Sequence, residues 1–180
     1  MRYVAFFRGI NVGGRNKIKM KDLAQFFIDL GFSQVKTYIQ SGNVVFSTEE
    51  VGFIHKLEEN FVEKFDITSK IIIRNQQEIT DILDFQAFST KEITRANQAN
   101  PEVVHEYVYL GTEKIDKEKV EEILAKIETP DLFHIHDKEI YLLVDDSVHK
   151  SKLANALGRL DFPLTARNMR TLNKVVEMME

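Results

Sequence analysis

The chain has 180 residues, a net charge of −4, 43% hydrophobic and 29% charged residues, and no cysteine. This composition favours a packed core over disorder, and the absence of cysteine excludes disulfides, thiolate metal sites and a cysteine nucleophile. The apolar run at residues 3–7 is too short for the core of a signal peptide, and no stretch reaches the about eighteen apolar residues of a membrane helix. We therefore expect a cytoplasmic protein without a membrane partner.

The first half of the chain contains an ordered series of strand and helix patterns. An apolar run that ends at Gly9 is typical of a buried strand, and apolar residues at helical spacing before Gly31 predict a helix that begins near Met20. The segment 47–50 (STEE) matches a capping box and predicts the start of a second helix. In chain order we expect a strand, a helix, a hairpin, a helix, a strand and a short capped helix, at residues 3–9, 20–30, 35–40 with 43–47, 50–65, 69–73 and 75–83.

The second half repeats this order. Asp116 can cap a helix that follows a strand, a turn at residues 137–138 joins two further strands, and Asn168 can cap the last helix. The elements are expected at residues 103–111, 116–127, 132–136 with 139–144, 153–160, 162–165 and 172–179.

The recurrence of seven elements after about 100 residues is the sequence signature of a duplication. Each unit has the strand and helix order of a ferredoxin-like fold, followed by an extra helix. We predict an α+β protein of two tandem ferredoxin-like βαββαβ units, with a first subdomain at residues 1–84 and a second, including the C-terminal helix, at 102–180. Residues 85–101 are polar, lack a clear period and are expected to connect the two.

The segment between the first strand and the first helix is the first candidate for a ligand site. Its glycines allow backbone N–H groups to turn toward an anion at the start of a helix. The glycine spacing matches a P-loop, but Arg15 stands where a lysine is needed, which argues against a nucleoside triphosphatase. Alternatively, the glycines only make a tight connection. The candidate ligand-binding residues are Arg8, Asn11, Gly13, Gly14 and Asn16.

The turn of the first hairpin is the second candidate, with Gln40, Ser41 and Asn43 as its residues. Serine and asparagine are ordinary turn formers, so simple turn chemistry also explains them. Gln40 is unusual because it extends a β run with a polar residue. Ser41 has no neighbouring histidine or lysine to act as a base, which argues against a nucleophile.

The third candidate lies around the expected start of the last helix. A helix start favours anions, and arginine and asparagine supply donors for them. A helix cap with a polar helix face is the alternative explanation. The candidate residues are Thr165, Arg167, Asn168 and Thr171, with Lys152 and Asn155 on the preceding helix.

Metal and cofactor chemistry have little support in the sequence. His134 and His136 alternate on one strand face as two ligands could, but no third ligand is indicated. No carboxylate pair stands out as an acid and a base. We expect neither a metal site nor a cofactor.

Three blocks of the sequence together resemble a bacterial family catalogued as domain of unknown function 1697. The resemblance runs from residue 2 to about residue 176 and implies a duplicated ferredoxin-like fold, but no established activity, substrate or cofactor. Family members commonly place tryptophan directly after the Arg-Asn pair of the third block, where this chain has Met169. The blocks are residues 8–14 with Asn16, Met20 and Leu23; residues 37–46; and Lys152-Leu153, Asn155, Thr165, Arg167-Asn168, Thr171 and Lys174.

The three blocks share donor-rich chemistry that suits phosphate and amide groups. We hypothesise that one surface or cleft collects Arg8, Asn11, Asn16, Gln40, Asn43, Arg167 and Asn168. The leading function is then a binding module for an anionic ligand: a nucleotide, a phosphorylated metabolite or nucleic acid, with the acidic net charge weakening the case for nucleic acid.

Two other functions stay open, and the sequence does not indicate the oligomeric state. An enzyme would rely on arginine, asparagine and lysine electrostatics, and a strongly lowered pKa at Lys152 or Lys174 would favour it. An assembly protein would pair through an exposed sheet edge or a large apolar patch.

Overall fold

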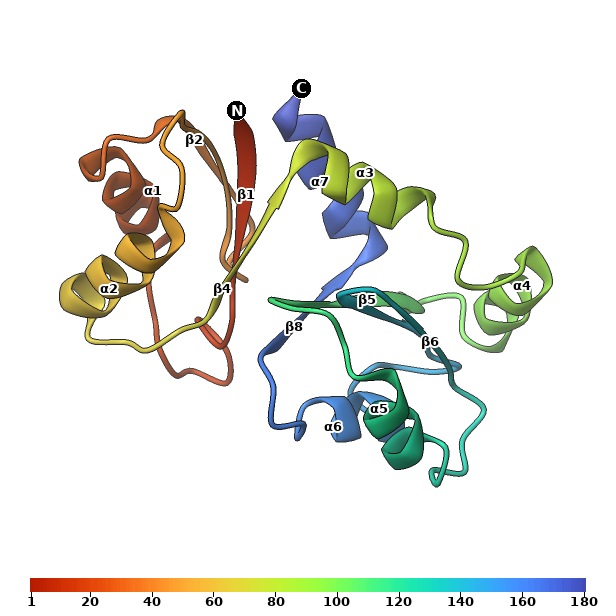
Figure 1. Ribbon diagram of the computed structural model, residues 1–180. Coiled ribbons are helices and arrows are strands. Elements are labelled where there is room, and N and C mark those ends of the chain that lie inside the picture. The colour runs from red at the N-terminus through yellow and green to blue at the C-terminus, as the bar shows by residue number, and fades with distance from the viewer. The chain divides into compact units, whose positions relative to one another are not determined.

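The computed structural model describes residues 1–180 and contains eight strands and seven helices (Figure 1). The strands form two four-stranded sheets in which all neighbouring strands are antiparallel. The prediction of an α+β protein with two similar units is confirmed. The chain divides into two compact units: the first is Met1–Leu83 with Leu172–Glu180, and the second is Asp84–Thr171.

The first unit contains one sheet with two helices over one of its faces. The strand order is β2-β3-β1-β4, and α1 and α2 cover the sheet (Figure 1). The elements are β1 (Arg2–Phe7), α1 (Met20–Asp29), β2 (Ser33–Tyr38), β3 (Asn43–Ser47), α2 (Ile54–Phe65), β4 (Ile71–Asn75) and α3 (Gln76–Asp84).

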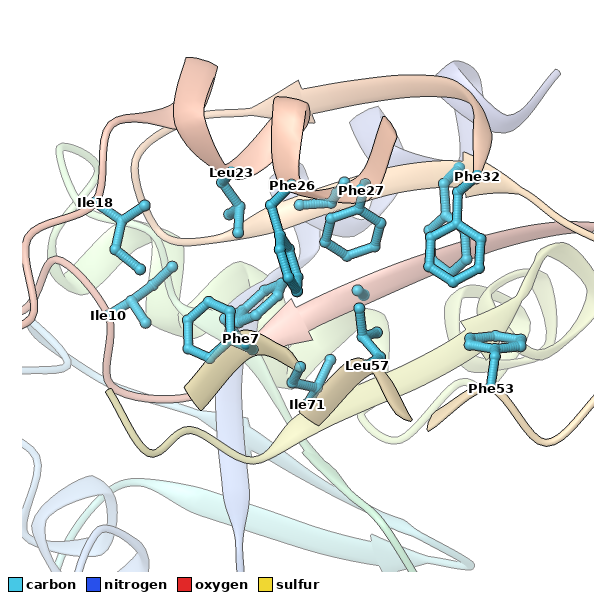
Figure 2. Packing of buried hydrophobic residues seen from close by; sticks show 14 residues of the cluster. Phe7, Ile10, Ile18, Leu23, Phe26, Phe27, Phe32, Phe53, Leu57 and Ile71 are labelled. Carbon is cyan, nitrogen blue, oxygen red and sulfur yellow. The ribbon is translucent and has the colours of Figure 1, made fainter. Parts of the chain in front are cut away.

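Phenylalanine rings dominate the core between this sheet and its helices (Figure 2). Phe7 of β1 lies 4.8 Å from Phe61 of α2 and 6.1 Å from Phe27 of α1, measured between ring centroids. Side chains alternate along a strand, so Ala5 and Phe7 enter this core while Val4 and Phe6 point to the opposite face. Each fully buried ring contributes about 1.5–3 kcal/mol.

The second unit repeats the arrangement. Its strand order is β6-β7-β5-β8, and residues of α5 and α6 pack with the sheet in one core. The elements are α4 (Thr90–Ala99), β5 (Glu106–Gly111), α5 (Lys117–Leu124), β6 (Leu132–His136), β7 (Glu139–Leu143), α6 (Lys152–Leu157) and β8 (Leu164–Asn168), and α7 (Met169–Met179) follows.

The capping box predicted at residues 47–50 is wrong. Ser47 ends β3, where it pairs with Arg2 of β1, and its hydroxyl donates to the side chain of Gln34 at 2.8 Å. The helix begins only at Ile54, after Gly52 with φ of 74°. Strand pairing therefore overrides the local helix signal at this position.

Within residues 85–101, which the sequence predicts to be a connecting segment, the structure contains a helix that the sequence pattern does not indicate, because α4 occupies residues 90–99. A capping box starts this helix: Ser89 accepts from the N–H of Glu92 at 3.3 Å, and the Glu92 carboxylate accepts from the N–H of Ser89 at 2.8 Å. Ala96 is its only buried residue, so the helix lacks the apolar period by which helices are recognised.

The extended segment predicted at residues 162–165 lies further along the chain as β8. Pairing with β5 runs from Leu164 opposite Gly111 to Asn168 opposite Tyr107. The last helix accordingly begins at Met169, directly after the strand.

Candidate functional site

The loop between β1 and α1, residues 8–19, is held at both ends by buried isoleucines. Ile10 and Ile18 point into the core near Leu23 (Figure 2), whereas residues 12–17 are all exposed. We refer to residues 8–19 as the basic loop. The exposed residues 12–17 therefore lie between two positions that are anchored in the core.

Asn11 and Asn16 shape this loop from within. The Asn11 side chain donates to the carbonyls of Ile18 at 3.0 Å and Gln40 at 2.9 Å, and accepts from the N–H of Ile18 at 2.8 Å. Asn16 donates to the carbonyl of Gly9 at 2.9 Å. Both asparagines have left-handed backbones, with φ of 54° and 49°, which asparagine tolerates better than most residues. Their side-chain amides therefore act as structural ties.

The basic loop exposes cations that no acid neutralises. The sequence has no carboxylate between Arg8 and Lys21, and the ion pairs of the protein involve other residues. Between these cations lie Gly13 and Gly14, both exposed and with positive φ. The uncompensated cations are Arg8, Arg15, Lys17 and Lys19.

The first helix starts beside these cations without a cap. Lys19 occupies the N-cap position of α1 and makes no side-chain hydrogen bond to the first turn. The N-terminal N–H groups and the helix dipole add positive potential to that of the loop, and the carboxylate of Asp22 in the first turn partly offsets it.

The first hairpin turn lies beside the loop, because Asn11 binds the carbonyl of Gln40. Asn43 is fully buried and donates to the carbonyl of Tyr38 at 2.9 Å and to the hydroxyl of half-buried Ser41 at 3.0 Å, so it closes the turn. Gly42 is required for steric reasons: a Cβ there would lie 2.5 Å from Ile10 Cδ1. Gln40 is the exposed polar side chain of this turn, next to exposed Ile39.

In the third candidate block, Thr165 and Arg167 lie in strand β8, and Asn168 at its end caps helix α7. Arg167 is 7% exposed and donates to the hydroxyl of Thr165 at 2.9 Å and to the carbonyl of Ala166 at 2.8 Å. Burial lowers the pKa of the Arg167 guanidinium to about 10. Asn168 accepts from the N–H of Thr171 at 2.8 Å, which confirms it as the cap of α7.

The structure does not bring the whole third block together. Leu164 and Ala166 of β8 belong to the core under α5 and α6, so Thr165 and Arg167 point to the opposite face of the sheet. Lys152 and Asn155 are exposed on α6, on the helix side. The second sheet therefore separates these two pairs of residues.

The first two blocks lie in the first unit, and the third block up to Thr171 lies in the second. The convergence of all seven hypothesised residues on one surface stays a prediction.

Sequence reasoning missed Arg74, which with the predicted cap residue Asn75 is the counterpart in the first unit of Arg167-Asn168. Arg74 pairs with Val4 of the first strand as Arg167 pairs with Val108 of the fifth. Arg74 is 3% exposed and donates to the carbonyl of Ile73 at 2.9 Å. Asn75 accepts from the N–H of Glu78 as the cap of α3, as predicted. The repeated Arg-Asn pair at the end of a strand was the available signal.

His134 and His136 lie against an aromatic ring. The ring of Phe85 stacks on His136 at 4.1 Å with an interplanar angle of 14°, and lies 5.4 Å from His134. The structure contains no group of three or more histidine, aspartate or glutamate side chains that could hold a metal ion. None of its helices has the length and apolar character needed to cross a membrane.

Comparison with known proteins identifies relatives of this sequence and fold. A solved structure described as conserved bacterial protein SP0830 from Streptococcus pneumoniae has 24% sequence identity and a TM-score of 0.76, over 99% of this chain and 98% of that chain. At this identity the likeness establishes the fold alone. No curated protein matches the sequence.

The family described as "Protein of unknown function (DUF1697)" matches residues 1–141. This range includes the first two sequence blocks, and the third block lies beyond it. The match covers more than half of the chain, so the resemblance inferred from the sequence is confirmed and the chain belongs to the family of domain of unknown function 1697.

Proposed function

We propose that this protein is a binding module for an anionic ligand that carries phosphate groups, and that the basic loop with Gln40 holds this ligand. The observation that carries the proposal is that two sets of side chains in the loop have different contacts. Asn11 and Asn16 fix its backbone, while Arg8, Arg15 and the lysines stay exposed without a carboxylate partner.

Electrostatics supports an anion at this position. Cations that gather without counter-charges repel one another, and a bound phosphate removes that repulsion. Arginine offers paired N–H groups that match two phosphate oxygens, and the uncapped start of α1 adds N–H donors on the same loop. Gly13 and Gly14 are both exposed, with the Lys17 side chain near Gly14.

A small ligand fits this protein better than nucleic acid. The net charge is −4 and the isoelectric point is about 5.8, so a long polyanion is repelled by most of the surface. The basic loop is a short local exception, suited to one or two phosphate groups.

The candidate residues of the first two blocks divide into two roles under this proposal. Arg8, Gly13, Gly14 and Gln40 contact the ligand, whereas Asn11, Asn16, Ser41 and Asn43 shape the loop and the turn. Thr165, Arg167, Asn168 and Thr171 form the junction of β8 and α7 rather than the ligand contacts.

We also propose that the two units arose by duplication of a ferredoxin-like βαββαβ unit, with residues 1–84 and 102–180 as the copies. The support is that each central first strand pairs with the third and fourth strands of its unit. The equivalent Arg-Asn pairs at residues 74–75 and 167–168 add to it.

The enzyme and assembly alternatives gain no comparable support. The hydrogen bond from Lys174 to Glu177 raises the pKa of that lysine, the opposite of the shift that a catalytic base would need. The edge strand β2 carries the exposed charge of Lys36, and charged residues on an edge strand oppose strand pairing between copies.

A thermal-shift experiment tests the proposed function with inorganic pyrophosphate, AMP, ATP and a short single-stranded DNA at two salt concentrations. A ligand at about a hundredfold over its Kd stabilises the protein by about 2.7 kcal/mol. The shift should disappear in the Arg8→Ala, Arg15→Ala double variant. It should persist in the control Lys56→Ala, Lys64→Ala, which removes two exposed cations from α2 of the same unit. Equal shifts in both double variants, or no shift with any probe, would overturn the proposal.

A further inference from the structure

The tip of the basic loop is a small β-hairpin. The N–H of Asn11 donates to the carbonyl of Asn16 at 3.0 Å, and the N–H of Arg15 donates to the carbonyl of Val12 at 3.0 Å. The two glycines of this turn both have positive φ, as in a type I′ turn. Val12 and Arg15 are bridge partners, so their side chains leave the hairpin on the same face. An exposed apolar side chain therefore accompanies the Arg15 guanidinium.

A second exposed apolar side chain lies in the neighbouring turn of the first hairpin. Val12 is 63% exposed and Ile39 is 49% exposed. The hydrogen bond from the Asn11 side chain to the carbonyl of Gln40 joins the two segments. Val12 directly follows the donor residue of this bond, and Ile39 directly precedes the acceptor residue. Apolar surface next to uncompensated cations suits a ligand that has both an apolar part and an anionic part.

The backbone of Ile39 is strained. Its φ is 47°, in the left-handed region that β-branched residues rarely adopt because the side chain clashes with the backbone. The residue is exposed and does not belong to the phenylalanine core, so core packing does not account for an isoleucine here. Backbone strain of this kind is concentrated at ligand sites, where a side chain serves a purpose other than stability.

We propose that the ligand of the basic loop is a nucleoside phosphate whose base lies against Val12 and Ile39. This inference rests on the proposed function and names the apolar part of its ligand. A nucleobase is apolar on its faces and polar at its edge, so apolar side chains cover a face. The exposed amide of Gln40 supplies donor and acceptor groups for the edge, as glutamine does for adenine. Arg8 and Arg15 hold the phosphates.

Other phosphorylated compounds match this surface less well. A sugar phosphate presents hydroxyl groups, which gain little from contact with valine and isoleucine. A lipid headgroup brings acyl chains, which need a larger apolar surface than two side chains. The end of a nucleic acid strand has the same base and phosphate, but the net charge of −4 opposes a long polyanion.

Calorimetric titration compares ADP with inorganic pyrophosphate, which has the phosphates without the nucleoside. Covering about 60 Å² of apolar surface strengthens binding about tenfold, so the wild-type Kd for ADP should be about tenfold lower than that for pyrophosphate. Val12→Thr and Ile39→Asn remove apolar surface and keep every cation. In each variant the two Kd values should differ by less than about threefold, with the Kd for pyrophosphate unchanged. Val62→Thr, at an exposed valine on α2 of the same unit, should keep the wild-type ratio.

Thermal unfolding of Ile39→Asn tests the role of the strained residue. Asparagine tolerates φ of 47° better than isoleucine, so the variant should melt at the wild-type temperature or above it. A lower melting temperature would show that Ile39 is retained for the fold, and would overturn its assignment to the ligand.

The titrations separate this inference from the proposed function. Pyrophosphate binding with no preference for ADP, or a preference that survives in both variants, would overturn the nucleoside phosphate and leave anion binding intact. Binding of neither compound would overturn both proposals. An adenine oligonucleotide that binds more tightly than ADP at physiological salt would overturn the free nucleotide in favour of a nucleic acid strand.

Discussion

The side chain of Asn11 donates a hydrogen bond to the main-chain carbonyl of Gln40 at 2.9 Å across 29 residues of sequence. The same amide binds both backbone groups of Ile18. One residue thus joins the loop after β1, the approach to α1 and the turn of the first hairpin. The first two sequence blocks are therefore parts of one structural feature.

Replacement of Asn11 by alanine should lower the free energy of unfolding by about 2–4 kcal/mol. The variant loses three hydrogen bonds, leaves partly buried backbone groups without partners and retains a left-handed backbone that alanine disfavours. Urea denaturation measures the change. Asn11→Gly relieves the backbone cost and should recover about 1 kcal/mol of it. Wild-type stability in Asn11→Ala would contradict the structural role.

The capping box of α4 should stabilise the protein, whereas the residues of the capping box predicted at 47–50 should not. Ser89→Ala removes the N-cap acceptor and should destabilise the helix by about 1 kcal/mol. Ser47→Ala removes one exposed side-chain contact and should change stability by less than about 0.5 kcal/mol. Hydrogen exchange measures the protection of the α4 and α2 amides: Ser89→Ala should lower it in α4, and Ser47→Ala should leave it unchanged in α2. Equal effects would contradict the assignment.

Phe61 should be among the most sensitive core positions. It is fully buried, with the rings of Phe7 at 4.8 Å and Phe65 at 5.0 Å. Phe61→Ala leaves a cavity on the inner face of α2 and should cost about 3–5 kcal/mol by chemical denaturation. Phe85→Ala, at a half-buried ring of the second unit, should cost less. The reverse order would show that the main core lies elsewhere.

The elements with clear periods could be predicted from the sequence, and those fixed by longer-range pairing could not. The spacing of Leu23, Phe26 and Phe27 indicates α1, and Asn168 indicates the start of α7. Helix α4 was not predicted, because Ala96 is its only buried residue and the segment therefore has no apolar period. The capping box predicted at Ser47 is wrong because Ser47 pairs with Arg2 in the sheet, and the local sequence pattern does not indicate this pairing.

The candidate site shows a similar division. The sequence identified the donor-rich segments, but not that Asn11, Asn16 and Asn43 use their amides within the fold. The direction of a side chain depends on backbone torsions and on partners far along the chain, neither of which follows from residue type. Arg74 was overlooked because it lies in an apolar strand pattern.

The Asp146 carboxylate should make the free energy of unfolding decrease at acidic pH. Hydrogen bonds from Lys150 and Asn100 lower its pKa from 3.8 to about 2. A lowered pKa contributes stability above the unfolded-state value, and this contribution disappears as the pH falls through the folded-state value. The stability difference between wild type and Asp146→Asn should therefore shrink as the pH falls from about 4 to about 2. A difference that is constant over this range would contradict the assignment.

The most direct test of anion binding at the basic loop is a titration of the nitrogen-labelled protein with inorganic pyrophosphate, followed through its backbone amide NMR signals. The proposal predicts saturable shifts at Gly13, Gly14 and the first turn of α1, with smaller shifts at Gln40, and their loss in the Arg8→Ala, Arg15→Ala double variant. No saturable shift in the loop, or shifts confined to residues outside the first unit, would contradict it.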